Sequence, residues 1–306
     1  MKKIIILCDL EGCIGIDMLQ NIDADAYMYC KECDIVLTTL SSLFPQYKLY
    51  VCDCHNNGQI LPRLSYAFPQ VIFYSQPWDI DFSQNFDYGM FIGFHGHNHT
   101  ADPLAHSFRP EITEVYLGNN IVGELRIFSN VLAKYNIPTV FVNGSKWITE
   151  ETSSLDHAVK SCIDHIGIFS QYDLLENAYY ELINNLTTLD FKHNSILVPY
   201  CDFPVKVQID SIGLGTYLKK YFNICKNVVY FKNTMDFFTR IRMLCERIGL
   251  YQQQRNKITY YIKNLVDANP PNYLYKNETK LRAMLETPIS ELSLEELTQI
   301  YNLLKE

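Results

Sequence analysis

The sequence predicts an α/β fold in which a mixed, largely parallel sheet is flanked by helices and followed by a helical C-terminal extension. Short, continuous apolar runs recur along the first 145 residues, as expected of strands that are buried on both faces. Helical patterns alternate with these runs, and such alternation is typical of βαβ units. A chain of 306 residues is also long enough to bury a sizeable core.

The first half of the chain contains most of the predicted sheet. A helical pattern separates the first two apolar runs and ends before Pro45. A hairpin is expected where Gly118, Asn119 and Asn120 interrupt a strand-like segment. In chain order, we expect a strand at 2–8, a helix at 25–44, strands at 48–52, 70–74 and 88–94, the hairpin near 113–125, a helix at about 123–135 and a strand at 138–144.

The second half is predicted to be richer in helix. Ser293 and Glu296 form a capping box for the last helix, and the pattern changes character after Leu250. We therefore expect residues 1–250 to form an α/β unit, which can divide into two lobes near 145–195, and 251–306 to form the extension. The expected elements are mainly helix over 154–186, strands at 195–200 and 206–210, and helices from 214, near 234–249, at 251–268 and at 293–306.

Composition excludes several classes of protein. A net charge of -8 and a pI near 5.5 argue against a nucleic-acid surface, since phosphate binding needs clustered Lys and Arg. No apolar run is long enough to span a bilayer, and Asp9 interrupts the first run too early for an export signal. Without such a signal, the ten cysteines are expected to be reduced thiols in a cytoplasmic protein.

Polar residues follow three of the predicted strands directly. Asp9 and Glu11 come after the run at 2–8, His55 comes after the second strand, and His95 comes after the strand at 88–94. In open α/β sheets, ligands bind at the carboxyl ends of the strands. Each residue alone is explained by a solvated turn or a loop, but three strand ends together predict a metal or catalytic cluster.

The residue types in this cluster favour a borderline divalent metal. Carboxylate and imidazole ligands suit zinc, with manganese, cobalt or iron as alternatives. Two acids and two histidines, with one further acid, can hold two ions that share a bridging carboxylate. Such a pair activates water and polarises a carbonyl group, which is the chemistry of an amide hydrolase.

Other histidines and cysteines lie close to these positions in the sequence. We expect His97 and His99 to be residues of a polar loop, although the alternation also permits adventitious chelation of a metal. Cys30 and Cys33 are expected to pack on one helical face. Cys54 is expected to be a small buried thiol, and the alternatives are a group that tunes the site or a soft ligand that competes for the metal. Cys8, Cys13 and Cys52 are also expected to be small buried thiols.

Five separated segments resemble, in order and approximate spacing, the motifs of the DppA-type D-aminopeptidases. These are zinc metallopeptidases that assemble into ring-like, self-compartmentalising homo-oligomers. The resemblance runs from about residue 4 to residue 145 and continues more weakly to about 250. The segments are CDLEGCIGI (8–16), VCDCHNNGQI (51–60), FIGFHG (91–96), ADPLAHS (101–107) and LGNNIVGELRIFSNVLAKYNIPTVFVNG (117–144).

The resemblance implies a role for each of six residues. It makes Asp9 a bridging carboxylate between two zinc ions, with Glu11 and His55 on one ion. His95 and Glu124 would hold the other ion. By the same resemblance, His106 acts in catalysis rather than as a ligand, the substrate is a small peptide or amide, and the protein is a homo-oligomer.

The sequence departs from the family after the strand at 138–144. Where the family usually has a Gly-Asp-Asp element, this chain has Asn143, Gly144, Ser145 and Lys146. The family's basic residues are also not evident over 165–175. Three functions therefore remain open: an amidohydrolase, an acyl transferase that delivers an amine within a biosynthetic pathway, and a non-catalytic, metal-stabilised assembly protein. The complete ligand set disfavours the third.

Overall fold

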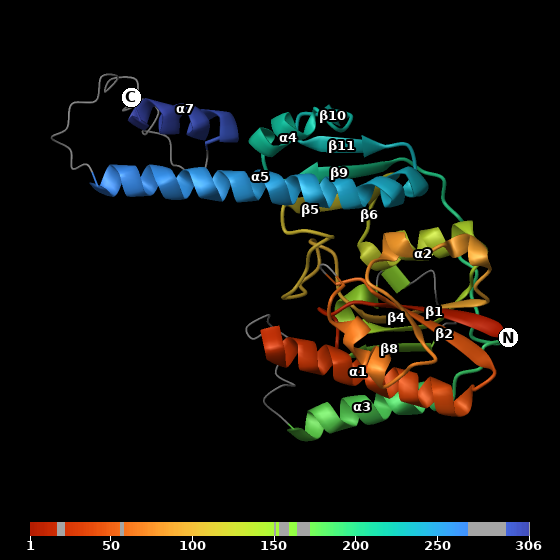
Figure 1. The fold of residues 1–306 in the computed structure, drawn as a ribbon. Helices are drawn as coiled ribbons and strands as arrows, with labels where there is room; N and C mark the ends of the chain where they lie inside the picture. The colour runs from red at the N-terminus through yellow and green to blue at the C-terminus, as the bar shows by residue number, and fades with distance from the viewer. Residues whose placement is uncertain are drawn as a thin grey trace.

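The structure is a computed structural model that describes residues 1–16, 22–55, 58–149, 151–152, 159–163, 172–268 and 292–305. It confirms the predicted α/β class. A parallel sheet lies beside a smaller antiparallel sheet, and helices follow towards the C-terminus (Figure 1). The antiparallel pairs are gathered in the second sheet, so the first sheet is parallel between all of its neighbouring strands.

The parallel sheet has six strands in the order β3-β2-β1-β4-β7-β8. Its central strands are almost fully buried because helices cover both faces, α1 and α3 on one side and α2 on the other (Figure 1). The strands are β1 (Lys2–Cys8), β2 (Tyr47–Asp53), β3 (Ile72–Tyr74), β4 (Tyr88–Phe94), β7 (Thr139–Ser145) and β8 (Val159–Ile163), and the helices are α1 (Ile22–Leu43), α2 (Glu124–Lys134) and α3 (Tyr172–Thr187).

The antiparallel sheet has five strands in the order β10-β11-β9-β5-β6. The predicted hairpin is present, and Gly118 takes a positive φ of 65° at its turn, where glycine carries no steric cost. The strands are β5 (Ile112–Leu117), β6 (Asn120–Ile121), β9 (Val205–Ile209), β10 (Ile224–Cys225) and β11 (Val228–Phe231), packed against α4 (Ile212–Leu218) and α5 (Thr234–Ala268). Short 3-10 turns are η1 (Leu61–Tyr66), η2 (Pro77–Asp79), η3 (Phe82–Gln84) and η4 (Lys146–Thr149).

Two of the predicted elements in the second half are wrong. Part of the segment predicted as mainly helical, residues 159–163, is strand β8, because the free edge of β7 offers it parallel hydrogen bonds. The predicted strand at 195–200 forms only one bridge, between Ile196 and Thr139. The predicted strand cannot continue along β7, because from Phe141 onward the same edge of β7 is hydrogen-bonded to β8.

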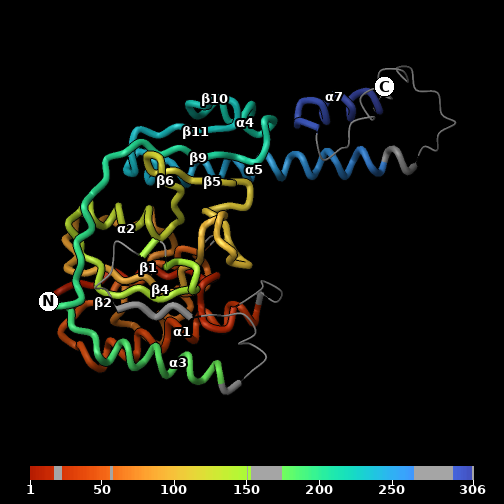
Figure 2. Tube along the Cα trace, turned by 180° about the vertical axis from the view of Figure 1, so that it is seen from behind, coloured from red at the N-terminus to blue at the C-terminus, as the bar shows by residue number. Residues whose placement is uncertain are grey.

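The helices at the C-terminal end form a projecting arm. Helix α5 runs without interruption from Thr234 to Ala268, so the separate helices predicted before and after residue 250 are one. It extends past the sheets, with α7 (Leu294–Lys305) alongside (Figure 2). The capping box is confirmed, because Ser293 and Glu296 exchange backbone-to-side-chain bonds of 2.7 and 3.2 Å. The division of the chain into two domains at residue 250 stays a prediction.

No helix among the described residues is both long and apolar enough to cross a membrane.

A buried carboxyl group joins α1 to the sheet. Glu32 is fully buried and accepts hydrogen bonds from the Ile14 backbone N–H at 2.6 Å and from Asn143 Nδ2 at 2.5 Å. Burial raises the pKa of Glu32 to about 7, although these hydrogen bonds oppose the shift. The contact ties the loop after β1 to the carboxyl end of β7.

We predict that Glu32→Gln removes a pH-dependent cost to stability. The unfolded chain releases this proton near the ordinary pKa of 4.5, whereas the folded chain retains it to about pH 7. The folded state binds more protons in this interval, so its stability falls as the pH rises, by about 3 kcal/mol at most. Urea unfolding at pH 5 and pH 8 should show a smaller pH effect in Glu32→Gln than in the wild type.

The matched control for this prediction is Glu181→Gln on the exposed face of α3. It should unfold with the wild-type pH dependence. If Glu32→Gln also keeps that dependence, the Glu32 carboxyl is already ionised in the folded protein and the prediction is wrong.

Candidate metal centre

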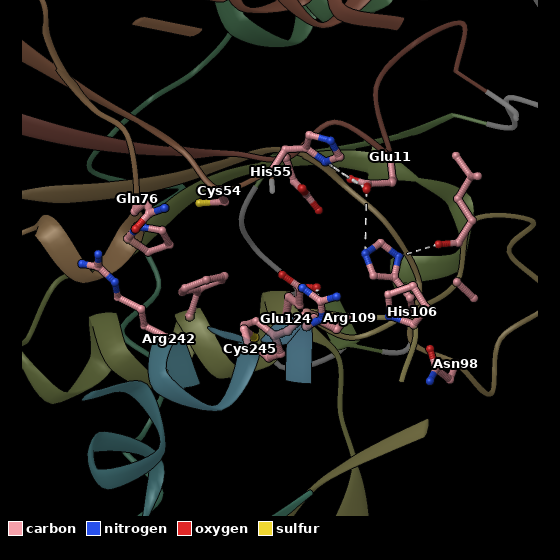
Figure 3. A pocket seen from close by; sticks show the side chains of 18 of the residues that line it. Glu11, Cys54, His55, Gln76, Asn98, His106, Arg109, Glu124, Arg242 and Cys245 are labelled. Carbon is pink, nitrogen blue, oxygen red and sulfur yellow. Dashed lines mark hydrogen bonds and ion pairs between the residues drawn. The ribbon is translucent and has the colours of Figure 1, made fainter. Parts of the chain in front are cut away.

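Six side chains from separate parts of the fold meet at the carboxyl edge of the parallel sheet. Five of them line a cavity of about 790 Å³ between this edge and α5 (Figure 3). The sixth, His95, lies against His106, with the two rings stacked at 4.3 Å. Asp9 and Glu11 follow β1, His55 follows β2, His95 follows β4, His106 lies in the loop before β5, and Glu124 begins α2. The structure thus brings together all six residues that the sequence singles out.

Two glycines place the loop after β1 against the end of β4. The Gly12 N–H donates to the Gly93 carbonyl at 2.8 Å, and a Cβ on Gly12 would lie only 1.9 Å from the Phe94 carbonyl oxygen. Gly93 has a φ of +71°, and a Cβ there would lie 2.1 Å from the Asp9 carbonyl oxygen. This close approach brings Asp9 Oδ2 to 3.3 Å from His95 Nε2.

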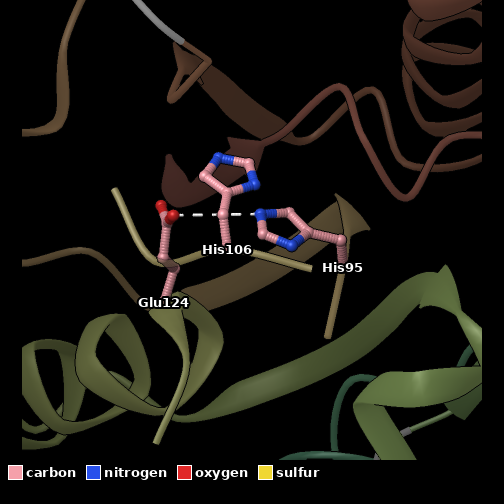
Figure 4. A group of neighbouring side chains, drawn as sticks. All are labelled: His95, His106 and Glu124. Atoms are coloured by element: carbon pink, nitrogen blue, oxygen red, sulfur yellow. Dashed lines mark ion pairs between the residues drawn. The ribbon is translucent and has the colours of Figure 1, made fainter. Parts of the chain in front are cut away.

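The six residues form two groups with the spacing of metal ligands. In the first, Asp9, Glu11 and His55 each offer an atom within 4.8 Å of the others. In the second, His95, His106 and Glu124 do the same (Figure 4). The groups adjoin, because Asp9 of the first lies beside His95 of the second.

Backbone carbonyls orient two of the histidine rings. His95 Nδ1 lies 2.9 Å from the Gly96 carbonyl oxygen, and His106 Nδ1 lies 2.9 Å from that of Leu104. A carbonyl only accepts, so each Nδ1 carries a proton, and in the neutral ring Nε2 presents a lone pair. His95 Nε2 faces Asp9, and His106 Nε2 lies 3.7 Å from Glu11 Oε1. Metal-binding histidines are commonly held in this way.

Added positive charge would favour the ionised form of the buried carboxyl groups in the site. Burial raises the pKa of Asp9 well above its usual range, and the neighbouring Glu11 and Glu124 raise it further. Burial also acts to raise the pKa of Glu11, but the hydrogen bond and charge of His55 outweigh it and lower this pKa. For His55 itself, burial lowers the pKa, and the Glu11 hydrogen bond more than reverses the effect.

Two buried atoms provide the direct test of whether a cation fits. Asp9 Oδ2 and His95 Nε2 face each other at 3.3 Å, and neither has a hydrogen-bond partner. A buried polar atom without a partner is costly, and each of these atoms can offer a lone pair to a cation. A divalent ion would satisfy both. The surrounding oxygen and nitrogen ligands match the donor set of zinc.

Further carboxylates hold the loops that carry the site. Asp53 accepts backbone N–H bonds from Ile60 and Leu61, at 2.9 and 3.0 Å, which closes the loop containing His55. Asp102 accepts from the Gly96 and Leu104 N–H groups, at 2.9 and 3.0 Å. These are the same residues whose carbonyls orient His95 and His106. The sequence alone did not point to Asp102, although it lies within the ADPLAHS motif.

Glu151 was also not anticipated from the sequence, and no local pattern there marks it. Its Oε2 accepts from the backbone N–H groups of Gly123 and Arg126, at 2.9 and 3.1 Å. It therefore caps the start of α2, where Glu124 lies. Burial raises the pKa of Glu151 to about 7, against these two hydrogen bonds.

Two further histidines and several cysteines lie close to the site residues in the sequence. His97 and His99 belong to neither metal-like group found among the described residues, and His99 Nε2 pairs with Glu114 at 2.7 Å. Cys54 lines the cavity, but burial raises the pKa of its thiol well above the usual range, which disfavours the thiolate a metal needs. Cys8, Cys13, Cys33 and Cys52 are buried, and Cys30 is partly buried.

The segment that replaces the family's acidic element has structural partners. Asn143 donates to Glu32, and Ser145 Oγ donates to Asp102 Oδ2 at 2.6 Å. Both side chains are therefore engaged in hydrogen bonds that support the loops at the sheet edge. Most of the segment 165–175, where basic residues are not evident in the sequence, lies outside the described residues.

Comparisons with known proteins agree with this geometry. No curated protein matches the sequence. A solved structure of the "Zn-dependent D-aminopeptidase DppA from Bacillus subtilis, a self-compartmentalizing protease" has a similar fold. Its TM-score is 0.62, with 16% identity over 80% of this chain and 97% of that chain. The profile of the peptidase M55 family, described as D-aminopeptidase, matches residues 1–186, which include all six site residues. This match covers more than half of the sequence, and the chain belongs to the peptidase M55 family.

Proposed function

We propose that this protein is a dinuclear zinc amidohydrolase that cleaves the amino-terminal residue from a short peptide, or a related small amide. The observation that carries the proposal is the pair of buried, unpartnered atoms Asp9 Oδ2 and His95 Nε2, where the two ligand groups adjoin. Family membership and the zinc-dependent structural relative support the choice of metal and of an amino-terminal substrate.

In this proposal, Asp9 would contribute a ligand to both ions. Glu11 and His55 would complete one site, and His95 and Glu124 would complete the other. Two bound zinc ions would activate a water molecule and polarise the scissile carbonyl. The Phe108 N–H donates to Glu124 Oε1 at 2.6 Å, which fixes one carboxylate oxygen and directs the group towards His95.

His106 is assigned to proton transfer. Its Nδ1 proton is committed to the Leu104 carbonyl, so only Nε2 faces the cavity, 3.7 Å from Glu11. From there the ring can take a proton at Nε2 and donate it to the departing amine nitrogen. Its grouping with His95 and Glu124 also permits metal ligation, and the experiment below separates the two roles.

An acyl transferase would use the same ligands and differ only in its nucleophile. Incubating the zinc-loaded protein with amide substrates, with and without an amine acceptor, distinguishes the activities by the mass of the products. Hydrolysis products alone support the hydrolase. A condensed product that requires the acceptor supports acyl transfer, and no turnover of any amide supports a metal-stabilised assembly protein.

We predict that the protein, reconstituted with zinc, binds about two ions per chain. Asp9→Ala should lose both ions, because it removes the shared ligand. His55→Ala and His95→Ala should each lose about one ion. Elemental analysis after gel filtration measures the content, and His193→Ala, far from the site in an exposed turn, is the matched control. A wild-type protein without bound metal would contradict the proposal.

We predict that His106→Ala and His106→Gln lower the turnover rate by about 10²- to 10⁴-fold, as expected for loss of a general acid–base group. Metal content and melting temperature should stay near the wild-type values. Full activity in both variants would remove His106 from the mechanism. Loss of one ion would make it a ligand instead.

We also propose that the protein forms a homo-oligomer, as the description of its structural relative as self-compartmentalizing suggests. The arm formed by α5 and α7 is an additional surface that can alter the contacts between subunits. Multi-angle light scattering should therefore give a mass several times the 35.6 kDa of one chain. A monomer across the working concentration range would be inconsistent with this expectation.

A further inference from the structure

The cavity that opens onto the metal centre is lined by two arginines that differ in depth. Arg242, on α5, has 53% of its side chain exposed and donates through Nε to Glu246 at 2.9 Å. Arg109 is less exposed, at 32%, and lies on the loop that carries His106 (Figure 3). Arg109 is therefore the arginine that a substrate held at the metal centre would meet.

A tight turn fixes Arg109 relative to the proposed ligands. The Phe108 N–H binds Glu124 Oε1 at 2.6 Å, and the Arg109 N–H donates to the Ser107 carbonyl at 2.7 Å. Phe108 has a φ of 63°, a conformation that a bulky residue adopts only when its surroundings impose it. The position of Arg109 is thus tied to that of Glu124.

The guanidinium group of Arg109 is held by one hydrogen bond, and the rest of the group can bind a ligand. Its Nε donates to Glu111 Oε2 at 3.0 Å, and among the described residues no protein acceptor is bound to either of its Nη nitrogens. Arginine binds carboxylates best through two parallel N–H groups, and such a pair remains here. Glu111 therefore aims the guanidinium group and leaves its outer edge for a ligand.

Helix α5 leaves space beside this group. A Cβ on Gly249, within the long helix, would lie 3.6 Å from Arg109 Nη1, so a longer side chain would occupy the space next to the guanidinium. Glycine in a helix interior destabilises the helix relative to alanine. Cys245, one turn earlier on α5, lines the same cavity as Arg109 and Glu124.

We propose that Arg109 binds the free carboxylate of a short peptide whose scissile amide lies at the metal centre. The inference rests on the proposed amidohydrolase function and adds the residue that would recognise the carboxyl end of a di- or tripeptide. A cavity of about 790 Å³ is of the size that holds such ligands. Each extended residue adds roughly 3.5 Å, so the carboxylate of a di- or tripeptide stays within the cavity that Arg109 lines.

The test compares peptides that differ only in the charge at the carboxyl end. The zinc-loaded protein is assayed with D-alanylglycine and D-alanylglycinamide, and with the corresponding pair one glycine longer. For at least one pair, we expect a KM about 10- to 100-fold lower for the acid than for the amide, the usual range for a hydrogen-bonded charge pair. Arg109→Gln should remove this preference, while its amide group can still donate to Glu111. Arg109→Lys should retain part of it.

The matched control is Arg242→Gln, which removes the more exposed arginine and should leave the acid-to-amide ratio of KM values unchanged. A Gly249→Leu variant should lose the preference with Arg109 still present, because its side chain fills the adjacent space. Binding of the same peptides to the full-length, metal-free protein is measured in parallel by calorimetry. That measurement does not depend on turnover.

The outcomes separate this inference from the proposed function. If acids and amides are cleaved equally well and Arg109→Gln changes neither, the carboxylate site is wrong and the hydrolase stands. If no peptide is cleaved but calorimetry shows an acid preference that Arg109→Gln abolishes, the carboxylate site stands and the proposed function is wrong. Equal binding of acids and amides without cleavage overturns both.

Discussion

The close contact between the loop after β1 and the end of β4 is the constraint on which the site depends. Gly12 and Gly93 let two backbones approach to a distance that no Cβ would allow, and this sets Asp9 against His95. The arrangement leaves two buried polar atoms that face each other without a hydrogen-bond partner, which is unfavourable. A bound cation would relieve this cost, so the proposed metal centre would be coupled to folding.

Carboxylates outside the proposed ligand set make this arrangement rigid. Asp53, Asp102 and Glu151 each accept two or more bonds from backbone N–H groups and so hold the segments that carry His55, His95 with His106, and Glu124. Each acts by organising the backbone around a functional side chain. Ser145 joins this set through Asp102, so the departure from the family at 143–146 has a structural role at the sheet edge.

The sequence was sufficient to predict features with a local signal. Buried strands β1, β2 and β4 are continuous apolar runs, and the residues that follow them, Asp9 and His95 among them, meet because parallel strands end at one edge. Strand β8 and the single bridge at Ile196 depend on which edge of β7 is free, which no local pattern reports. Asp102 and Glu151 were missed for the same reason, because their partners are set by tertiary contacts.

The two sides of the cavity have different origins in the chain. The family profile covers residues 1–186, and with them every proposed metal ligand and the turn that carries His106 and Arg109. Part of the opposite wall comes from α5, which lies beyond the matched residues. The proposed chemistry at the sheet edge therefore lies in the part of the chain that matches the family, whereas the space around Arg109 depends on Gly249 and its neighbours in this chain. A change in α5 would alter the proposed substrate site without altering any proposed metal ligand.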